Sequence, residues 1–201
     1  MDAAKDLTTL YDPLKHEAIL AHAEFQIWDE LYATHPDRVA VLNATAGGFF
    51  SMLSPVLADN VMMRLSRLTD PPGTGKKRNL TLRGLVPLLT DGSADITAFT
   101  RKLDALDATC DAMRVQRNKR MAHLDLHTAT VDGADPLPGV RVADIRKALV
   151  ELQEALNVFE RHHLLAVCPN WTRHFGIGSM NLRGDEFNGN TQPGFGWAQA
   201  L

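Results

Sequence analysis

Apolar residues recur at the spacing of an α-helix along most of this chain, and this pattern limits the fold more than any other feature. The clearest segment runs from Val142 to about Leu165. Its apolar residues stand three or four positions apart and are Ile145, Leu149, Leu152, Leu156 and Phe159. No segment shows the convincing alternation with a period of two that a half-buried β-strand requires. The sequence therefore predicts an all-α bundle of four to five principal helices.

The first helix is expected to start at Asp12 and Pro13, because Asp12 can cap a helix and proline suits the first helical turn. It should end at His35, since a residue that precedes a proline avoids the helical conformation. A second segment, which Asp37 can cap, is expected from Val39 to Ala46. The pair Gly47-Gly48 predicts a break after it.

A strongly apolar helix is expected from Phe49 to Asp70, and Pro55 should bend it or mark its true start. Its most apolar part, Phe49 to Val61, is interrupted by serine, proline and aspartate. No segment is therefore expected to cross a bilayer. A loop rich in proline, glycine and lysine should occupy residues 70–79, and a short helix or turn should follow from Leu80 to Leu89.

A long helix is expected from about Ala94 to about His123. Its apolar stripe comprises Ile96, Phe99, Leu103, Leu106, Cys110, Met113 and Ala122. Residues 125–139 contain two prolines and should form a loop before the last helix. Residues 1–168 are interpreted as one helical domain, and residues 169–201, which have little periodicity, as an irregular C-terminal tail.

Composition restricts the classes of protein to consider. The chain has 201 residues with 45% hydrophobic residues, which is enough to bury a core, and a net charge of −3. That charge excludes a generally basic protein that coats nucleic acid, but it allows a local basic site. Two cysteines cannot form a disulfide framework, and no secretory signal stands at the N-terminus, so a cytosolic location is expected.

Two groups of basic residues are local candidates for binding a polyanion. One comprises Lys76, Lys77 and Arg78, with Arg83, and we interpret it as a solvated face. Residues 71–77 resemble a phosphate-binding loop, but the glycine three positions before Gly73 is replaced by Asp70. The residue after Lys76 is also not the serine or threonine that holds magnesium. The expected context is a helix rather than a strand, so ATP hydrolysis is not expected.

Other catalytic chemistry has little support in the sequence. His123 and His127 stand four residues apart, but the glutamate of a zinc-protease helix and a third ligand are both missing. No metal and no cofactor are therefore expected. Cys110 lies on the apolar stripe and is interpreted as a core residue.

The second basic group lies between Ala112 and Leu124, where no acidic residue occurs. Within it, the segment Arg117-Asn118-Lys119-Arg120-Met121-Ala122-His123 combines groups suited to cutting RNA. A neutral histidine can accept the 2′-hydroxyl proton, and an arginine can bind two phosphate oxygens in the transition state. In a straight helix, six residues rotate by about 600°, so Arg117 and His123 would point about 120° apart. They converge only if the helix end distorts, if Arg117 uses its long stem, or if a two-fold axis brings two copies together.

At these residues the chain resembles the HEPN superfamily, the higher eukaryote and prokaryote nucleotide-binding domains, and in particular the branch linked to abortive phage infection. The run from Arg117 to Asp125 has the form Arg-Asn-Lys-Arg-x-Ala-His-Leu-Asp expected in that branch. The segment from Arg64 to Pro71 and the stretch Asn79 to Leu82 also match. The resemblance covers roughly residues 10–165.

The resemblance implies a dimeric helical bundle that acts as a metal-independent ribonuclease in a toxin–antitoxin or phage-defence system. It implies that Arg117 contacts the scissile phosphate and that His123 is the acid or base. It also implies that Asn118 orients phosphate or sugar, or holds the partner chain. The remaining basic residues would attract RNA, and they are Arg114, Lys119 and Arg120. RNA, a second copy of the chain and a neutralising antitoxin are the partners implied.

One departure concerns the antitoxin. A HEPN toxin group carries a tyrosine two residues after the histidine, where a nucleotidyltransferase partner modifies it, and here that position is Asp125. Two further hypotheses stay open beside the ribonuclease. One is a non-catalytic nucleotide- or RNA-binding module that dimerises through its helices. The other is an ordinary structural role, in which Arg117 and His123 form hydrogen bonds within the chain.

Overall fold

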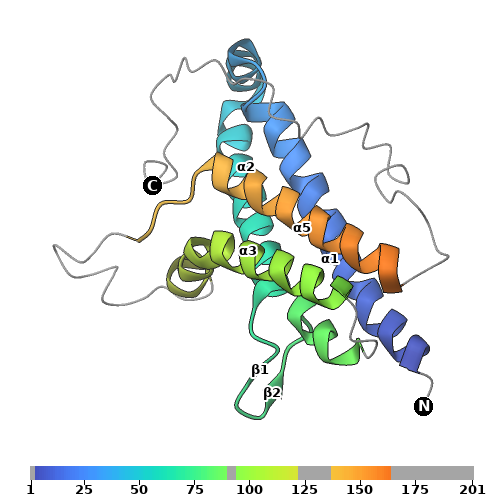
Figure 1. The fold of residues 1–201 in the computed structure, drawn as a ribbon. Helices are drawn as coiled ribbons and strands as arrows, with labels where there is room; N and C mark the ends of the chain where they lie inside the picture. The colour runs from blue at the N-terminus through green and yellow to red at the C-terminus, as the bar shows by residue number, and fades with distance from the viewer. Residues whose placement is uncertain (1–2, 90–93, 122–136, 164–201) are drawn as a thin grey trace.

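The computed structural model describes residues 3–89, 94–121 and 137–163, and it is helical over most of them. Its elements in chain order are α1 (Ala3–Tyr32), α2 (Pro36–Thr69), β1 (Gly73–Thr74), β2 (Lys77–Arg78), η1 (Leu82–Leu88), α3 (Ala94–Gln116), η2 (Arg117–Met121) and α5 (Val142–His163). Figure 1 shows α1 and α2 as a long antiparallel pair, with α3 and α5 lying across them. The predicted all-α bundle is confirmed.

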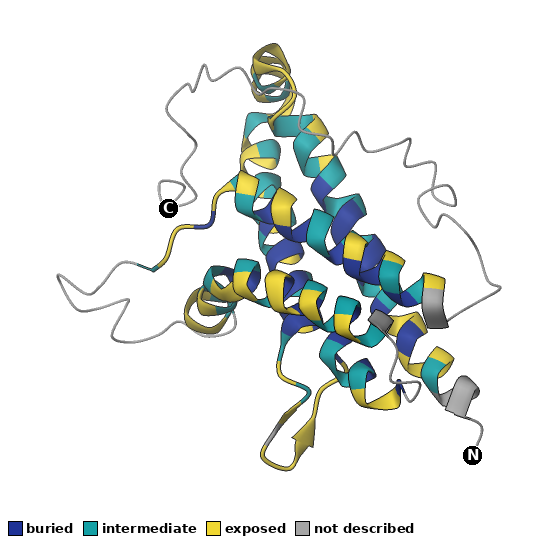
Figure 2. Ribbon diagram, in the orientation of Figure 1, coloured by how far each residue is buried: buried dark blue, intermediate teal, exposed yellow. Residues whose placement is uncertain are grey.

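The core lies where the four long helices meet. Tyr11 of α1 stacks on Phe159 of α5, with ring centroids 4.7 Å apart, and Phe99 of α3 lies 5.3 Å from the same ring. All five apolar residues predicted for the buried face of α5 are buried. Figure 2 shows buried residues in dark blue along the long helices. The stripe predicted for α3 is also buried from Phe99 to Met113.

The predicted start of the first helix is wrong. Helix α1 begins at Ala3, and Pro13 lies inside it rather than in its first turn. The extension is explained by packing, because Leu7 contacts the core and Tyr11 is only 1% exposed. Burial of these two side chains outweighs the local preference of proline for a helix start.

Helix α2 combines the two helices expected between residues 39 and 70. It begins at Pro36, with His35 as its N-cap, and non-helical angles at Ala46 mark a kink one residue before Gly47-Gly48. The predicted break is therefore confirmed in place, although the two halves stay joined. Pro55 lies within the helix and does not mark its start.

The N-terminal half of α2 is uncharged and not buried over residues 39–57, and we call this stretch the bare half of α2. No charged residue occurs between Arg38 and Asp59, and no residue from Val39 to Leu57 is buried. By length and composition α2 is apolar enough to cross a membrane, so the expectation that no segment qualifies is wrong by this criterion. That expectation considered only Phe49 to Val61, whereas the uncharged stretch is longer. One such helix is a weak indication of a membrane span, and α1 packs along it.

The loop expected at residues 70–79 contains a short β-hairpin that the sequence interpretation did not predict. Gly73 pairs with Arg78 and Thr74 with Lys77, in antiparallel register. Gly75 has a φ of 60°, which a left-handed turn position requires and glycine adopts without strain. The helix expected from Leu80 to Leu89 is the 3₁₀-helix η1, with Pro87 inside it.

Candidate functional site

The Arg-Asn motif lies on an irregular turn at the end of α3. There the α-helix changes into the π-helical segment η2, which covers Arg117–Met121. Single-turn π-helices are rare in proteins, but those that occur often lie at functional sites. Distortion of the helix end is one of the ways in which Arg117 and His123 could converge. This distortion is present up to Met121. His123 and His127, the C-terminal end of the expected long helix, and residues 164–201 lie outside the described residues.

Arg117 is held in place by two oxygen atoms. Its Nη1 donates to Asp70 Oδ2 at 2.5 Å, and its Nε donates to Asn118 Oδ1 at 3.0 Å. The side chain is only 15% exposed. A guanidinium has five N–H donors, and Nη2 has no partner within residues 3–89, 94–121 and 137–163. Arg117 therefore has a fixed orientation, and its Nη2 donors are unused within the part of the chain that the structure describes.

Asp70 owes its position to the end of α2, where it is the C-cap residue in an extended conformation. Its backbone leaves the helix there, and the chain continues into the β-hairpin through Pro71. In the sequence, Asp70 drew attention only because it replaces a glycine of the phosphate-binding loop pattern. Its contact with Arg117 was not predicted, because 47 residues separate the two in the chain. The matching segment from Arg64 to Pro71 was the signal that could have indicated it.

Arg120 is fixed to the middle of α2. It donates through both terminal nitrogens to Asp59, at 2.6 and 3.1 Å, and its Nε donates to Gln116 Oε1 at 3.1 Å. The side chain is 37% exposed, so this ion pair is accessible to solvent. Together with the Asp70 contact, it attaches η2 to α2 at two points.

Arg114 faces the protein rather than the solvent. Its Nη1 donates to Thr69 Oγ1 at 2.9 Å, and its Nη2 donates to the carbonyl oxygen of Asp107 at 2.8 Å and to Asp111. The side chain is 18% exposed. These contacts connect α3 to the last turn of α2 and leave Arg114 little capacity to bind RNA.

The basic run is therefore largely neutralised within the fold. Arg114, Arg117 and Arg120 each have an acidic partner, and those partners come from α2 and from the preceding turns of α3. Lys119 is exposed and has no ion pair in the part of the chain that the structure describes. The prediction of a basic site rested on the absence of acidic residues between Ala112 and Leu124. In the fold, acidic residues from outside this stretch lie beside its arginines.

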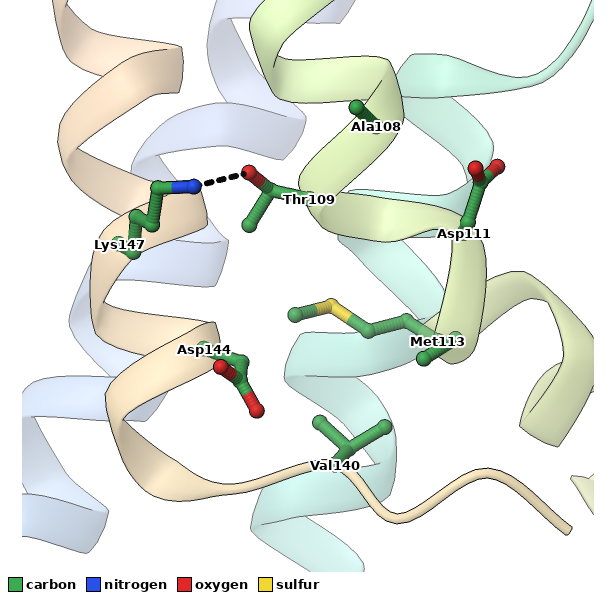
Figure 3. A pocket seen from close by; sticks show the side chains of 8 residues that line it. Ala108, Thr109, Asp111, Met113, Val140, Asp144 and Lys147 are labelled. Carbon is green, nitrogen blue, oxygen red and sulfur yellow. Dashed lines mark hydrogen bonds between the residues drawn. The ribbon is translucent and has the colours of Figure 1, made fainter.

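A cavity of about 340 Å³ lies between α3 and the start of α5, one turn before the motif (Figure 3). Met113 and Val140 are its buried apolar residues, and Lys147 Nζ donates to Thr109 Oγ1 across it at 3.1 Å. Its two carboxylates are already paired, Asp111 with Arg114 and Asp144 with Arg141. The hydrogen bonds from Arg141 lower the pKa of Asp144 below its ordinary value. The cavity thus offers few free polar groups to a ligand.

Cys110 is a core residue, as the sequence predicted. Its side chain is fully buried, and burial raises the pKa of the thiol to about 12. A thiol with this pKa is protonated near neutral pH and is a poor nucleophile. Within the described ranges, no group of three His, Cys, Asp or Glu side chains is arranged to hold a metal ion.

Comparison with known proteins gives one result. A HEPN-type family model described as AbiU2 matches residues 4–176, which is most of the chain. No curated protein and no solved structure matches it.

Proposed function

Because this chain belongs to the AbiU2 family of HEPN proteins, which is linked to abortive infection, we propose that it is a metal-independent endoribonuclease of phage defence. The observation that supports this proposal most is the state of Arg117. The motif arginine lies on a π-helical turn and is oriented by Asp70 and Asn118, and its Nη2 has no hydrogen-bond partner among the described residues. That combination suits a residue that must bind phosphate oxygens without reorganising.

The proposed chemistry needs one arginine and one histidine. His123 accepts the proton of the 2′-hydroxyl, and the 2′-oxygen attacks the adjacent phosphorus. The bond from phosphorus to the 5′-oxygen then breaks, and a protonated histidine supplies the proton to that leaving oxygen. The products are a 2′,3′-cyclic phosphate and a 5′-hydroxyl. Arg117 stabilises the extra negative charge on the phosphoryl oxygens as the 2′-oxygen bonds.

The other motif residues take supporting roles in this proposal. Asn118 orients the Arg117 guanidinium through its side-chain oxygen, and its amide nitrogen is left to contact phosphate or sugar. Lys119 is exposed and can attract RNA, and Arg120 can do so where a phosphate competes with Asp59. The contacts of Arg114 favour a structural role for this residue over one in RNA binding.

A homodimer would allow the Arg117 of one copy to act beside the His123 of the other. The bare half of α2 is the described surface best suited to a second copy. Its exposed apolar side chains include Phe49 at 61% and Met52 at 73%, and large exposed apolar patches mark interaction sites. Because no charge lies between Arg38 and Asp59, this face can pair with its own two-fold copy without like-charge repulsion.

A non-catalytic binding or assembly module is the second candidate, and one observation favours it. The three arginines of the basic run are all engaged within the chain, which reduces the positive field available to a polyanion. On this alternative the same fold binds nucleotide or RNA, or assembles as a dimer, without cutting.

Cleavage of end-labelled RNA in EDTA distinguishes the two candidates. We expect wild-type protein to cut, and Arg117→Ala and His123→Ala to lose at least about a hundredfold in rate. Arg101→Ala is the control, because it removes an exposed arginine of α3 away from the motif, and it should retain most of the activity. Saturable RNA binding without any product, at protein concentrations where a reference ribonuclease cuts, would favour the binding module instead.

A further inference from the structure

The β-hairpin formed by β1 and β2 projects from the helical body directly after α2 (Figure 1). It carries Lys76, Lys77 and Arg78 in succession, and all three are exposed. From the sequence, these cations are expected to form part of a solvated face. Their surroundings in the structure differ from those of the other basic residues.

Most lysines and arginines of the described residues are engaged by an acid. Those in ion pairs are Lys15, Arg64, Arg67, Arg83, Lys102, Arg114, Arg117, Arg120, Arg141, Arg146 and Lys147. The three cations of the hairpin have no ion pair within the described ranges. Arg38, Arg101, Lys119 and Arg161 also have no ion pair among the described residues, but they stand singly along the sequence. The hairpin is thus the place where unpaired positive charge is concentrated in the described structure.

The hairpin holds these charges in a defined position. Gly75 forms its tight turn with a φ of 60°, and the base is closed by Asn79, which donates from Nδ2 to Pro71 O at 3.0 Å and from its backbone N to Pro72 O at 2.9 Å. A Cβ at Gly73 would lie 3.3 Å from Lys77 O, which is a tight contact, and 3.6 Å from Arg78 Cδ, which is an ordinary one. The Arg78 stem therefore lies across β1.

We propose that this hairpin binds the sugar-phosphate backbone of single-stranded RNA and delivers the strand to Arg117. The choice of RNA as ligand and its delivery to Arg117 rest on the proposed function. Gly73 follows Asp70 by three residues, so the base of the hairpin lies within about 10 Å of the residue that holds Arg117. Residues 71–80 include no aromatic side chain for stacking on bases, so the hairpin contacts phosphates without regard to sequence.

The test is fluorescence anisotropy with a labelled single-stranded RNA over a series of salt concentrations. Lys76→Ala/Lys77→Ala should reduce the slope of log affinity against log salt by about 1.4, because each phosphate contact contributes about 0.7. Arg101→Ala/Arg161→Ala is the matched control, since it removes two exposed and unpaired cations elsewhere, and it should leave the slope unchanged. In the cleavage assay the hairpin variant should raise KM and leave kcat near the wild-type value.

The outcomes distinguish a failure of the hairpin proposal from a failure of the proposed ribonuclease function. Binding that depends on the hairpin without any cleavage would support the hairpin site and refute the ribonuclease. Cleavage with the wild-type KM and salt slope in the hairpin variant would overturn the hairpin site alone. Absence of RNA binding by wild-type protein would also overturn it.

Discussion

At the scale of single residues, the contact between Asp70 and Arg117 is the most informative feature of the candidate site. The N–H donors of Arg117 that have no described partner can reach a substrate only if the guanidinium keeps its orientation. Asp70 provides that orientation from the end of another helix, at 2.5 Å. We therefore regard Asp70 as a positioning residue that acts through Arg117.

Asp70→Ala should lower kcat for RNA cleavage by about 10- to 100-fold with little change in KM, since a hydrogen bond to a charged group contributes about 1.5–3 kcal/mol. Asp59→Ala is the matched control, because it frees Arg120 from the same helix and should leave kcat nearly unchanged. Asp70→Asn keeps an oxygen that can accept from Nη1 and should recover part of the loss. A kcat for Asp70→Ala within twofold of wild type would refute the positioning role.

His22 gives the fold a predictable dependence on pH. It is 2% exposed, and its ring nitrogens lie 2.9 Å from Ala18 O and 3.2 Å from Leu149 O. Burial lowers the pKa of His22 below its ordinary value of 6.5, and the two backbone hydrogen bonds oppose this only in part. Between the lowered pKa and 6.5 the unfolded chain binds more protons than the folded chain, so stability falls as the pH falls below about 6.5.

Urea unfolding at about pH 7.5 and about pH 5.5 measures this effect, which cannot exceed about 1.4 kcal/mol per pH unit for one proton. His22→Gln removes the titrating ring and should flatten the dependence, even if the variant is less stable at both pH values. An equal loss of stability on acidification in wild type and variant would show that other groups cause it.

At the scale of elements, the helices were predictable wherever apolar periodicity and packing agree. The stripe of α5 is buried as expected, and Gly47-Gly48 lies beside the kink of α2. The start of α1 could not be read locally, because Tyr11 is fixed by Phe159, which is distant in the sequence. The same limit applies to the site, since the acids that engage Arg117 and Arg120 belong to α2.

The hairpin was missed because its strands have two residues each, too few for an alternating pattern. Its dependence on Gly75 is a prediction at this scale. Gly75→Ala should destabilise the hairpin by about 1–2 kcal/mol, because a Cβ is disfavoured in the left-handed region. Amide hydrogen exchange at Thr74 and Lys77 should become faster by about tenfold.

Gly84→Ala is the control for this substitution. A Cβ at Gly84 would meet Thr81 Oγ1 at 3.8 Å and Pro72 Cβ at 3.9 Å, which are ordinary contacts. Exchange in the hairpin should therefore stay at the wild-type rate in Gly84→Ala. Equal exchange rates in Gly75→Ala and wild type would contradict the left-handed conformation assigned to residue 75.

At the scale of the whole molecule, the fold divides into a well-packed body and a bare half of α2. A lone chain gains nothing from exposing Phe49, Met52 and Val56, which are 61%, 73% and 55% exposed. Covering this face in a dimer would remove apolar surface from water, and homodimer interfaces are typically the more apolar class.

Phe49→Asp should convert a dimer into a monomer, because two copies of the new charge would meet near the two-fold axis without partners. Light scattering coupled to size-exclusion chromatography measures the mass. Thr97→Asp places the same charge on an exposed position of α3 and should leave the dimer intact. A dimeric Phe49→Asp protein, or a monomeric wild type, would exclude this face as the dimer contact.

The most direct test of the account is the chemistry of the RNA ends produced by wild-type protein in EDTA. Mass spectrometry of the products should show 2′,3′-cyclic phosphate or 3′-phosphate with 5′-hydroxyl ends. A substrate with a single 2′-deoxy residue at the cleavage site should resist cutting there, because the nucleophile is missing. Ends that carry 5′-phosphate, cleavage that requires a divalent metal, or undiminished cutting at the 2′-deoxy position would contradict the roles given to Arg117 and His123.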